Sequence, residues 1–512
     1  MRGRDPDGDR ALVNKPDPRW TLAAAILGSS MVFVDGTVVN VALPAIQQQL
    51  AADAAQAQWV IESYALFLAS LLLVGGALGD RFGRRRIFLA GIILFTVAAL
   101  ACAMSHTIEQ LIAARAVQGI GGALLVPGSL ALISGAYPEQ DRGRAIGIWS
   151  GASGVAAAVG PVIGGFLIDH ASWTWAFFIN LPLGVLLFPL ARAKVAEIRA
   201  PGANHLDIPG AALATMALGG IVFALIEAPV RGWTSPLVLG AAAAGALALV
   251  AFVVTETHRK APMLDFALFR NRDFAGANLL TLALYAALGG GLYFLPLNLI
   301  QVQGYGATAA GAALIPFVVL LFLLSPWAGT LVTRYGARPP LVIGPAIAAA
   351  GFALFAWPSI GGSYWTTYFP AVCVLGLGMS ITVAPLTTTV MNSVGSDRAG
   401  IASGVNNAVS RVAALLSIAV FGIVMSLAFD SMLAESLPAL KLPQPLVNAV
   451  LEQRTRLAAI ELPESAGPHA QAIRHAIGEA FVAGFRRVML LSAGLALLSA
   501  AAAGLMLRRR PS

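Results

Sequence analysis

Three ionisable residues, Asp35, Glu62 and Arg115, lie inside apolar segments of this 512-residue chain. A carboxylate inside a membrane span costs about 2.5–3.5 kcal/mol on insertion scales, so such a residue normally has a function and a partner. A carboxyl group can gain and lose a proton, whereas an arginine keeps its charge. These residue types therefore predict an acid that carries protons beside a permanent cation.

Counting along the segments places all three residues in one layer. Asp35 is eight residues from the end of its segment near Leu43, which is about 12 Å at 1.5 Å per residue. Arg115 and Glu62 each lie about 8 Å from the starts of theirs. A nearby arginine favours the charged form of Asp35 and desolvation favours the neutral form, so their competition would load and release a proton. A static structural ion pair is the alternative.

The composition indicates a polytopic membrane protein. Hydrophobic residues make up 58% of the chain, charged residues 11%, and the mean hydropathy is +0.77. A soluble domain is about 25% charged. Apolar runs well beyond ten residues indicate helices rather than barrel strands. The net charge of +8 is explained by the positive-inside rule, without a nucleic-acid partner. Cys102 and Cys373 both lie in apolar segments, so neither a disulfide nor a metal site is expected.

The predicted fold is an all-α membrane protein with fourteen spans. The breaks fall at glycine, proline and charge clusters. The expected helices lie near 20–43, 57–79, 86–105, 110–135, 143–168, 174–193, 207–228, 236–256, 274–300, 307–332, 340–357, 366–390, 399–427 and 481–507.

Lysine and arginine fix the expected orientation. They gather in the polar tail 1–19 and in alternate loops, including 79–86, whereas the short opposite loops hold only Arg231. Both termini are therefore expected in the cytoplasm, and the tail lacks the apolar core of a signal peptide. The long acidic loop 428–480 then lies outside the cell. It is read as a solvated cap, and a short amphipathic helix over 446–462 is the alternative.

An internal repeat divides the chain. Segment 76–85 ends the second span and segment 329–338 ends the tenth, with Gly, Leu, Arg, an aromatic residue, Gly and Arg at matching places. The repeat predicts two six-helix bundles, 20–193 and 274–512, with two extra spans in 194–273. Parallel six-helix halves are typical of one transporter architecture.

Four stretches together resemble a known family. They are 35–44 in span 1, the loop 76–85, the run 115–122 in span 4, and Gly154 with 160–165 in span 5. The chain resembles the major facilitator superfamily, specifically its fourteen-span drug:proton antiporters, over almost everything after the tail. The resemblance implies multidrug efflux and antibiotic resistance, with the protein in the plasma membrane.

The resemblance assigns the loop after span 2 to a cytoplasmic gate. In the family, the acid matching Asp80 meets the start of a helix in the other half, here near 398–400, where the helix dipole favours an anion. Positive-inside charge alone would explain the arginines but not Asp80 or the glycines. The gate residues are Gly76, Gly79, Asp80, Arg81, Gly83, Arg84 and Arg85.

The span 5 pattern is the one associated with antiporters. Gly160 and Gly164 are four residues apart, so they share a helix face and let another helix approach closely. Pro161 removes a backbone hydrogen bond and permits a kink. A hinge face that prevents leaks is implied by the resemblance, and plain helix packing is the alternative. Gly154 and Gly165 complete the pattern.

Further polar and aromatic residues are candidates for lining a substrate cavity. Arg411 lies about 20 Å into span 13 and faces either the cavity or a partner acid. Glu62 departs from the family, where an uncharged polar residue is common. It would carry a second proton, balance a cationic substrate, or lie exposed near the outer boundary. The cavity candidates are Tyr64, Gln118, Tyr285, Tyr293, Phe294, Asn298, Gln301 and Arg411.

The function expected from these observations is proton-coupled export of amphipathic, cationic toxic compounds. A transporter of one metabolite in the same fold, exporting or importing, is the alternative. The lack of an added soluble domain argues against a membrane sensor or scaffold. No nucleotide-binding lysine motif or catalytic constellation is present, so neither ATP nor enzymatic activity is expected. The proton gradient would replace a cofactor. A periplasmic adaptor protein and a monomer working alone are both left open.

Overall fold

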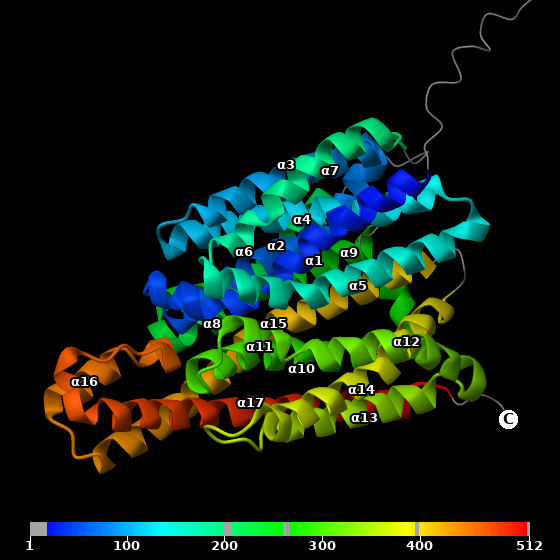
Figure 1. Cartoon of the computed structure of the whole chain (residues 1–512). Coiled ribbons are helices and arrows are strands. Elements are labelled where there is room, and N and C mark those ends of the chain that lie inside the picture. The colour runs from blue at the N-terminus through cyan, green and yellow to red at the C-terminus, as the bar shows by residue number, and fades with distance from the viewer. Residues whose placement is uncertain (1–17, 199–206, 260–263, 265, 395–398, 509–512) are drawn as a thin grey trace, which may run out of the picture.

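The protein is described by a computed structural model that covers residues 18–198, 207–259, 264, 266–394 and 399–508. Long helices lie side by side in a bundle, and the described residues contain no strand (Figure 1). Thirteen helical segments are long and apolar enough to cross a membrane, and helix α2, bent by 50° near Leu73, makes a fourteenth. The predicted all-α membrane fold is confirmed.

The first six spans pack together and are called the first bundle. Asp53 begins α2 with a capping box to Gln56, and Thr107 caps α4, so the helix starts follow local sequence signals. Helix α1 packs along α4 and α5, and α4 packs along α2 and α3. The helices are α1 (Pro18–Gln49), α2 (Ala54–Phe82), α3 (Arg84–Ala103), α4 (Ile108–Ala136), α5 (Glu139–His170), α6 (Trp175–Phe178) and α7 (Asn180–Lys194).

The last six spans form the second bundle. Helix α10 packs on α15 and α17, and α14 packs on α12 and α13. A short 3-10 helix, η1 (Phe266–Arg270), comes before the second bundle in the chain. The elements of the second bundle are α10 (Arg272–Leu297), the π-helical turn η2 (Asn298–Val302), α11 (Ala307–Ala312), α12 (Ile315–Tyr335), α13 (Arg338–Phe355), α14 (Tyr364–Asn392), α15 (Ala399–Ala439) and α17 (Ala470–Met506).

Two further helices, α8 (Ile208–Arg231) and α9 (Pro236–His258), lie beside the two bundles. Helix α8 packs against α9 and also against α2 and α15. Its Val222 and Ile226 join Leu66 of α2 and Leu415 of α15 in one buried apolar cluster. The boundary where the two bundles meet is called the seam, and α8 covers one side of it.

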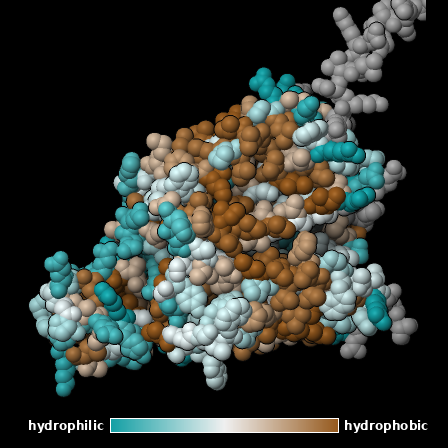
Figure 2. Space-filling view, in the orientation of Figure 1, coloured by the Kyte–Doolittle hydropathy of each residue, from teal (hydrophilic) through white to brown (hydrophobic). Residues whose placement is uncertain are grey.

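The two ends of the bundle differ in character. The end that carries Arg81, Arg334, Arg338 and Arg508 is called the basic end, and the end that carries segment 440–469 is called the loop end. The loop end lies at the left of Figure 1, where α16 is labelled. Figure 2 shows a broad apolar surface in the middle of the molecule and hydrophilic side chains gathered at the two ends, as expected for a chain that spans a bilayer.

The prediction for the long loop was wrong in two respects. Helix α15 continues to Ala439 and α17 begins at Ala470, so the connection is 440–469 rather than 428–480. Apolar residues drive this extension, since Phe429 and Leu433 of α15 are buried in the same cluster as Ile473 and Ile477 of α17.

The connection itself is packed, and is not a solvated cap. It contains α16 (Gln444–Glu452) and two 3-10 helices, η3 (Arg454–Ala459) and η4 (Glu464–His469), rather than one helix over 446–462. Leu446, Val450 and Leu457 are buried against the protein. Leu457 has a backbone φ of 55°, a left-handed conformation that a branched residue adopts only when its surroundings enforce it.

Candidate functional site

Asp35 of α1 lies in a fully buried polar cluster. Arg115 of α4 donates through Nη1 to Asp35 Oδ2 at 2.5 Å. Gln118 Nε2 of α4 and Asn180 Nδ2 of α7 both donate to Asp35 Oδ1, at 2.8 and 3.0 Å. None of the four side chains has any exposed surface. Three donors from two other helices therefore hold the carboxylate.

The guanidinium of Arg115 connects three helices. Its Nε donates to the carbonyl of Val60 on α2 at 3.0 Å, and its Nη1 also donates to Gln118 Oε1 at 2.7 Å. The guanidinium lies 4.1 Å from the ring centre of Tyr64, so a cation–π contact adds to the ion pair. A buried charge pair is stable only when its remaining hydrogen-bonding groups are satisfied, and these contacts satisfy most of them.

Asn180 belongs to this cluster and was not among the predicted site residues. The available signal was a lone amide in the apolar stretch 176–181, directly before Leu181 and Pro182. Gln118 was predicted to line a cavity, but it is buried between Asp35 and Arg115 and also accepts a hydrogen bond from Cys102 at 3.5 Å. Its place is in the cluster around Asp35 in this conformation.

Glu62 of α2 is completely buried, so the exposed position that was one of its alternatives is wrong. In the described part of the chain, neither of its carboxyl oxygens has a hydrogen-bond partner. It shares the layer of Arg115, which bonds the carbonyl of Val60 two residues earlier. Its electrostatic neighbour across the seam is the phenol of Tyr293 on α10. An unpaired charge buried there would cost several kcal/mol, so the group needs a proton or a cation.

The remaining cavity candidates divide into two sets. Tyr293, Phe294 and Asn298 are buried in the core of the second bundle, where Asn298 donates to the Tyr368 hydroxyl at 3.0 Å. Tyr293, Phe294 and Gln301 line a small hollow at the seam, and Gln301 also bonds Gln47 of the first bundle. The predicted cavity residues therefore lie in different surroundings.

Tyr285 and Arg411 are only partly buried. Arg411 of α15 has no carboxylate within 4 Å among the residues that the structure covers. Its electrostatic neighbour is Tyr64, the residue that stacks on Arg115. Tyr64 therefore lies between the buried cluster of the first bundle and the one arginine in the middle of α15.

The loop after α2 is tied to its own bundle. Asp80 pairs with Arg84 at 2.9 Å, and Arg84 also donates to the carbonyl of Ala131 at 2.8 Å. Gly83 has φ of 113°, and a side chain there would also meet the carboxylate of Glu197 at 2.6 Å. Glu197 accepts the backbone amides of residues 85 and 86 and so caps α3.

The partner predicted for Asp80 lies near 398–400, and residues 395–398 are outside the described residues. Gly76 and Gly79 lie on the last turns of α2, and a Cβ at either position would only reach ordinary contact distance, 3.6 and 3.8 Å. Arg81 stacks on Phe82 at 5.1 Å, and Arg85 donates to the carbonyl of Val195. The described contacts of this loop are therefore those of a turn anchored on the first bundle.

The glycines of α5 face three different surroundings. A Cβ at Gly160 would lie 2.4 Å from Thr37 Oγ1, and one at Gly164 would lie 1.9 Å from Val38 Cγ2, so this face packs on α1. A Cβ at Gly165 would lie 2.4 Å from the carbonyl oxygen of Ala307 on α11, in the second bundle. Gly154, nearer the basic end, has open space. The pattern therefore serves close approach at the loop end.

The close approach around α5 continues toward Pro161. A Cβ at Gly311 of α11 would lie 2.2 Å from the carbonyl oxygen of Pro161. At the end of α5, Asp169 accepts the backbone amides of Ala307 and Thr308 at 2.9 and 2.8 Å, and the Thr308 hydroxyl at 2.6 Å. A carboxylate at the start of a helix satisfies free amides and complements the helix dipole.

Other contacts join the bundles at the loop end. Gln301 of η2 donates to Gln47 Oε1 of α1 at 2.9 Å. Arg456 of η3 donates to the carbonyl of Ala51 at 3.3 Å. The loop end is thus closed by direct contact between the bundles, whereas a Cβ at Gly147, Gly151 or Gly154 of α5 would touch nothing within 4 Å.

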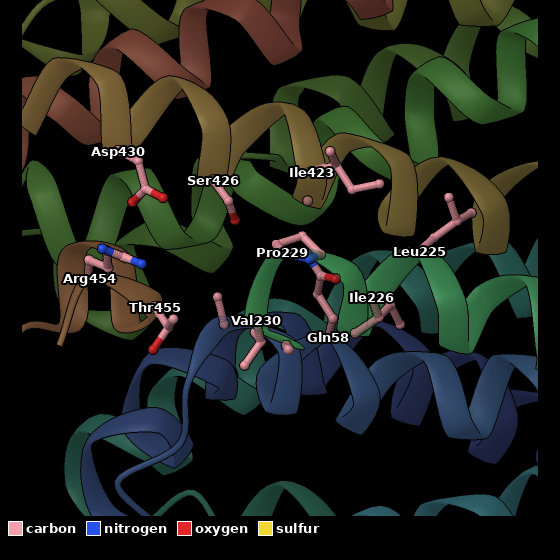
Figure 3. Close-up of a pocket in the computed structure, with 13 residues that line it drawn as sticks. Gln58, Leu225, Ile226, Pro229, Val230, Ile423, Ser426, Asp430, Arg454 and Thr455 are labelled. Atoms are coloured by element: carbon pink, nitrogen blue, oxygen red, sulfur yellow. The ribbon is translucent and has the colours of Figure 1, made fainter. Parts of the chain in front are cut away.

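A separate small pocket lies at the loop end between α2, α8, α15 and η3. Figure 3 shows Asp430 of α15 facing Arg454 of η3, with Gln58 of α2 on the opposite wall from Ile423. A Cβ at Gly422 would collide with the Gln58 amide, so the pocket floor is a tight contact across the seam. The pocket is apart from the cluster around Asp35.

Comparison with known proteins decides the family. The sequence model of the Major Facilitator Superfamily matches residues 25–418. The chain belongs to the Major Facilitator Superfamily. It is accordingly a membrane transporter and not an enzyme. Its solved structural neighbours agree with this superfamily fold. A bacterial homologue of the lysosomal transporter Spinster covers 96% of this chain and 98% of its own, with a TM-score of 0.67 at 16% identity.

Curated relatives within the superfamily cover most of the chain. The tetracenomycin C resistance and export protein of Streptomyces glaucescens is 32% identical, over 95% of this chain and 91% of its own. The multidrug resistance protein Stp of Mycobacterium tuberculosis is 35% identical, over 85% and 80%. The methylenomycin A resistance protein of Bacillus subtilis is 36% identical, over 79% and 87%.

Proposed function

We propose that this superfamily member is a proton-coupled antiporter that exports amphipathic, cationic drugs by alternating access. The observation that carries the proposal is the fully buried carboxylate of Asp35, held by Arg115, Gln118 and Asn180 inside the first bundle. A carboxyl in this position can exchange a proton, and its fixed cationic partner cannot. The proton gradient supplies the energy, and no cofactor takes part.

Coupling follows from the cost of separating a buried pair. Breaking such a pair while both charges stay buried costs about 3–5 kcal/mol. Any rearrangement that moves Arg115 away from Asp35 is therefore favoured when Asp35 takes up a proton first. Proton binding and the change of conformation then favour each other, as linkage requires. Release of the proton restores the pair.

Export of drugs is supported by the relatives. Proteins named for multidrug resistance and for resistance to tetracenomycin C and methylenomycin A match most of this chain. A preference for cations is supported by Glu62, a buried carboxyl group whose oxygens have no partner among the described residues. A bound cation or a second proton would satisfy it, and these two roles differ in their consequences.

Glu62→Gln separates the two roles. Glutamine keeps the size but cannot ionise. Export of cationic compounds is expected to fall at least tenfold (about 1.4 kcal/mol), while neutral compounds are exported as before. The measurement is export of a panel of cations and neutral compounds by cells and by proteoliposomes. A changed ratio of protons to substrate assigns Glu62 as a second proton carrier instead.

Glu256→Gln is the matched control for this test. Glu256 is another buried glutamate, with 2% of its surface exposed, but it lies on α9 away from the seam. Its substitution should leave the range of exported cations unchanged. Equal export of all compounds by the wild type and Glu62→Gln would leave Glu62 without a transport role.

Alternating access is supported by the different states of the two ends. The bundles 20–193 and 274–512 are the proposed moving units, linked by 194–273. With both termini in the cytoplasm, the loop end, which contacts between the bundles close, would face outward. The chain works as a monomer or with a periplasmic adaptor protein, in the plasma membrane.

Asp80→Asn tests the proposed cytoplasmic gate. Among the described residues Asp80 bonds only the neighbouring Arg84, and a partly exposed pair of this kind contributes about 0–1 kcal/mol to stability. Thermal stability should therefore change little. Transport should fall several-fold, because the state that is closed on the cytoplasmic side loses the contact that Asp80 is proposed to make there. A cysteine introduced by Gly151→Cys should react faster with a maleimide applied from the cytoplasmic side.

Asp273→Asn is the control for the gate. Asp273 also pairs with an arginine at the basic end, Arg508, at 3.8 Å. Its loss should change neither transport nor labelling. Unchanged transport and labelling in Asp80→Asn would remove the gate role from that residue.

Transport by the purified protein tests the function itself. Proteoliposomes with an imposed pH gradient should accumulate ethidium, a fluorescent amphipathic cation, against its gradient, and a protonophore should abolish the accumulation. Cells with and without the protein, exposed to a broad panel of compounds, then separate multidrug export from export of one metabolite. Accumulation that ignores the pH gradient would contradict proton coupling.

A further inference from the structure

Asn180 differs from the other two partners of Asp35 in one respect. Its Nδ2 donates to Asp35 Oδ1 at 3.0 Å, but its own Oδ1 is buried and has no hydrogen-bond partner among the described residues. Buried polar atoms are normally paired, and an unpaired one calls for an explanation. Here the unpaired acceptor belongs to the same amide that touches the carboxylate.

The other two partners, Arg115 and Gln118, can only donate hydrogen bonds to Asp35 in their present arrangement, so they stabilise its charged form. Arg115 has donors only and cannot accept a hydrogen bond. Gln118 has an acceptor, but its Oε1 already receives Arg115 Nη1 at 2.7 Å and Cys102 Sγ at 3.5 Å. Turning the Gln118 amide would break both bonds. A protonated Asp35 therefore cannot donate to Arg115 at all, and it can donate to Gln118 only if Gln118 gives up its hydrogen bonds from Arg115 and Cys102.

The Asn180 amide can turn without breaking a hydrogen bond to its own oxygen, because that oxygen has no partner among the described residues. A half-turn of its amide exchanges nitrogen and oxygen in nearly the same volume, with no movement of the backbone. One orientation donates to a carboxylate, and the other accepts from a carboxylic acid. We propose that Asn180 is the positioning residue that serves both protonation states of Asp35, by turning its amide when the proton arrives. This inference rests on the proposed function, in which Asp35 carries the proton.

The position of Asn180 suits this role. It is the first residue of α7, immediately after the short helix α6, whose Phe177 ring lies 5.8 Å from the Arg115 guanidinium. The start of α7 thus brings a fully buried amide to the carboxylate, where it shares Asp35 Oδ1 with Gln118 of α4.

Five ionisable groups lie in or near this cluster besides Asp35. They are Arg115 of α4, Tyr64 of α2, Cys102 of α3, Arg411 of α15, and Glu62, two residues from the Val60 carbonyl that Arg115 bonds. All five stay unchanged in the variants below, so a change in the titration of Asp35 is assigned to the amide alone.

Infrared titration of the full-length protein in lipid vesicles tests the inference without any substrate. The carboxylic C=O band that disappears in Asp35→Asn is the signal of protonated Asp35. In Asn180→Leu the titration midpoint is expected to move up by about one pH unit, a tenfold change in proton affinity. The carboxylate loses a charge-assisted hydrogen bond, which is about twice as strong as the neutral bond lost by the acid. The band should also move to higher frequency.

Three further variants complete the test. Asn180→Gln keeps the amide and should restore most of the wild-type midpoint. Asn180→Ala should repeat the shift, so the inference stays testable if leucine does not fit. Asn298→Leu is the matched control, since Asn298 is also buried with an unpaired Oδ1 but donates to the neutral hydroxyl of Tyr368. It should leave the Asp35 midpoint unchanged.

The outcomes separate this inference from the proposed function. An Asp35 band that titrates normally, with the same midpoint and frequency in Asn180→Leu and Asn180→Ala, overturns the role of Asn180 alone. If Asp35→Asn removes no titrating band, Asp35 carries no proton, and the proposed function fails.

Discussion

Asp35→Asn is expected to abolish uphill export, with at least a hundredfold loss of pH-driven accumulation of ethidium in proteoliposomes. Asparagine fits the same space but cannot carry a proton, so uptake and release are no longer linked to movement. The structure adds a complication, because Arg115 then keeps a buried charge without its counter-ion. Removing one partner of a buried pair costs about 3–5 kcal/mol, so reduced stability is expected too.

A double variant separates the two effects. Asp35→Asn combined with Arg115→Gln removes both charges, and replacing a buried pair as a whole is often neutral for stability. We expect the double variant to regain much of the lost stability while coupling stays absent. Recovery of coupled transport in the double variant, or its survival in Asp35→Asn, would contradict the role of Asp35.

Gly165→Ala should reduce export at least tenfold by preventing the loop end from closing. The added methyl group would lie 2.4 Å from the carbonyl oxygen of Ala307 and 2.7 Å from Thr308 Cα. Both are backbone atoms, which cannot move aside as a side chain can. The contact is also fixed by the hydrogen bonds that the first backbone amides of α11 donate to the Asp169 carboxylate. The bundles must therefore separate at this point.

Labelling measures this separation directly. Gln47 is buried at the loop end, where it accepts a hydrogen bond from Gln301. A cysteine introduced by Gln47→Cys should be protected in the otherwise unchanged protein and reactive from the outside in Gly165→Ala. Gly151→Ala is the matched control on the same helix, since a methyl group there touches nothing within 4 Å. Equal transport by both alanine variants would remove Gly165 from the closure.

The spans and the main ion pair could be predicted from sequence. Hydropathy gives the length and order of the helices, and counting residues at a fixed rise gives depth. Depth was sufficient to bring Asp35 and Arg115 together, since both lie in one layer of neighbouring helices. Depth does not give the rotation of a helix about its axis. Gln118 was therefore expected in a cavity, and Asn180 was missed.

Other features depend on how the bundles meet. Glu62 is completely buried, and its helix α2 packs on α4 of its own bundle and on α15 of the other, so its burial could not be read from α2 alone. The partner expected for Asp80, near 398–400, falls largely outside the described residues, so the gate contact stays a prediction. The extension of α15 past its predicted end at residue 427 depends on packing against α17, which the hydropathy of a single segment does not report.

Helix α8 has a consequence for compounds dissolved in lipid. Its side chains Val222 and Ile226 fill the boundary between α2 and α15 together with Leu66 and Leu415. A hydrophobic molecule diffusing in the bilayer therefore meets a sealed wall on that flank. Helix α9 packs on α8, so the wall is two helices thick. Among the described residues, no helix covers the opposite flank, where α5 meets α11 and α12, so the extra pair of helices makes the two lipid-facing sides of the transporter unequal.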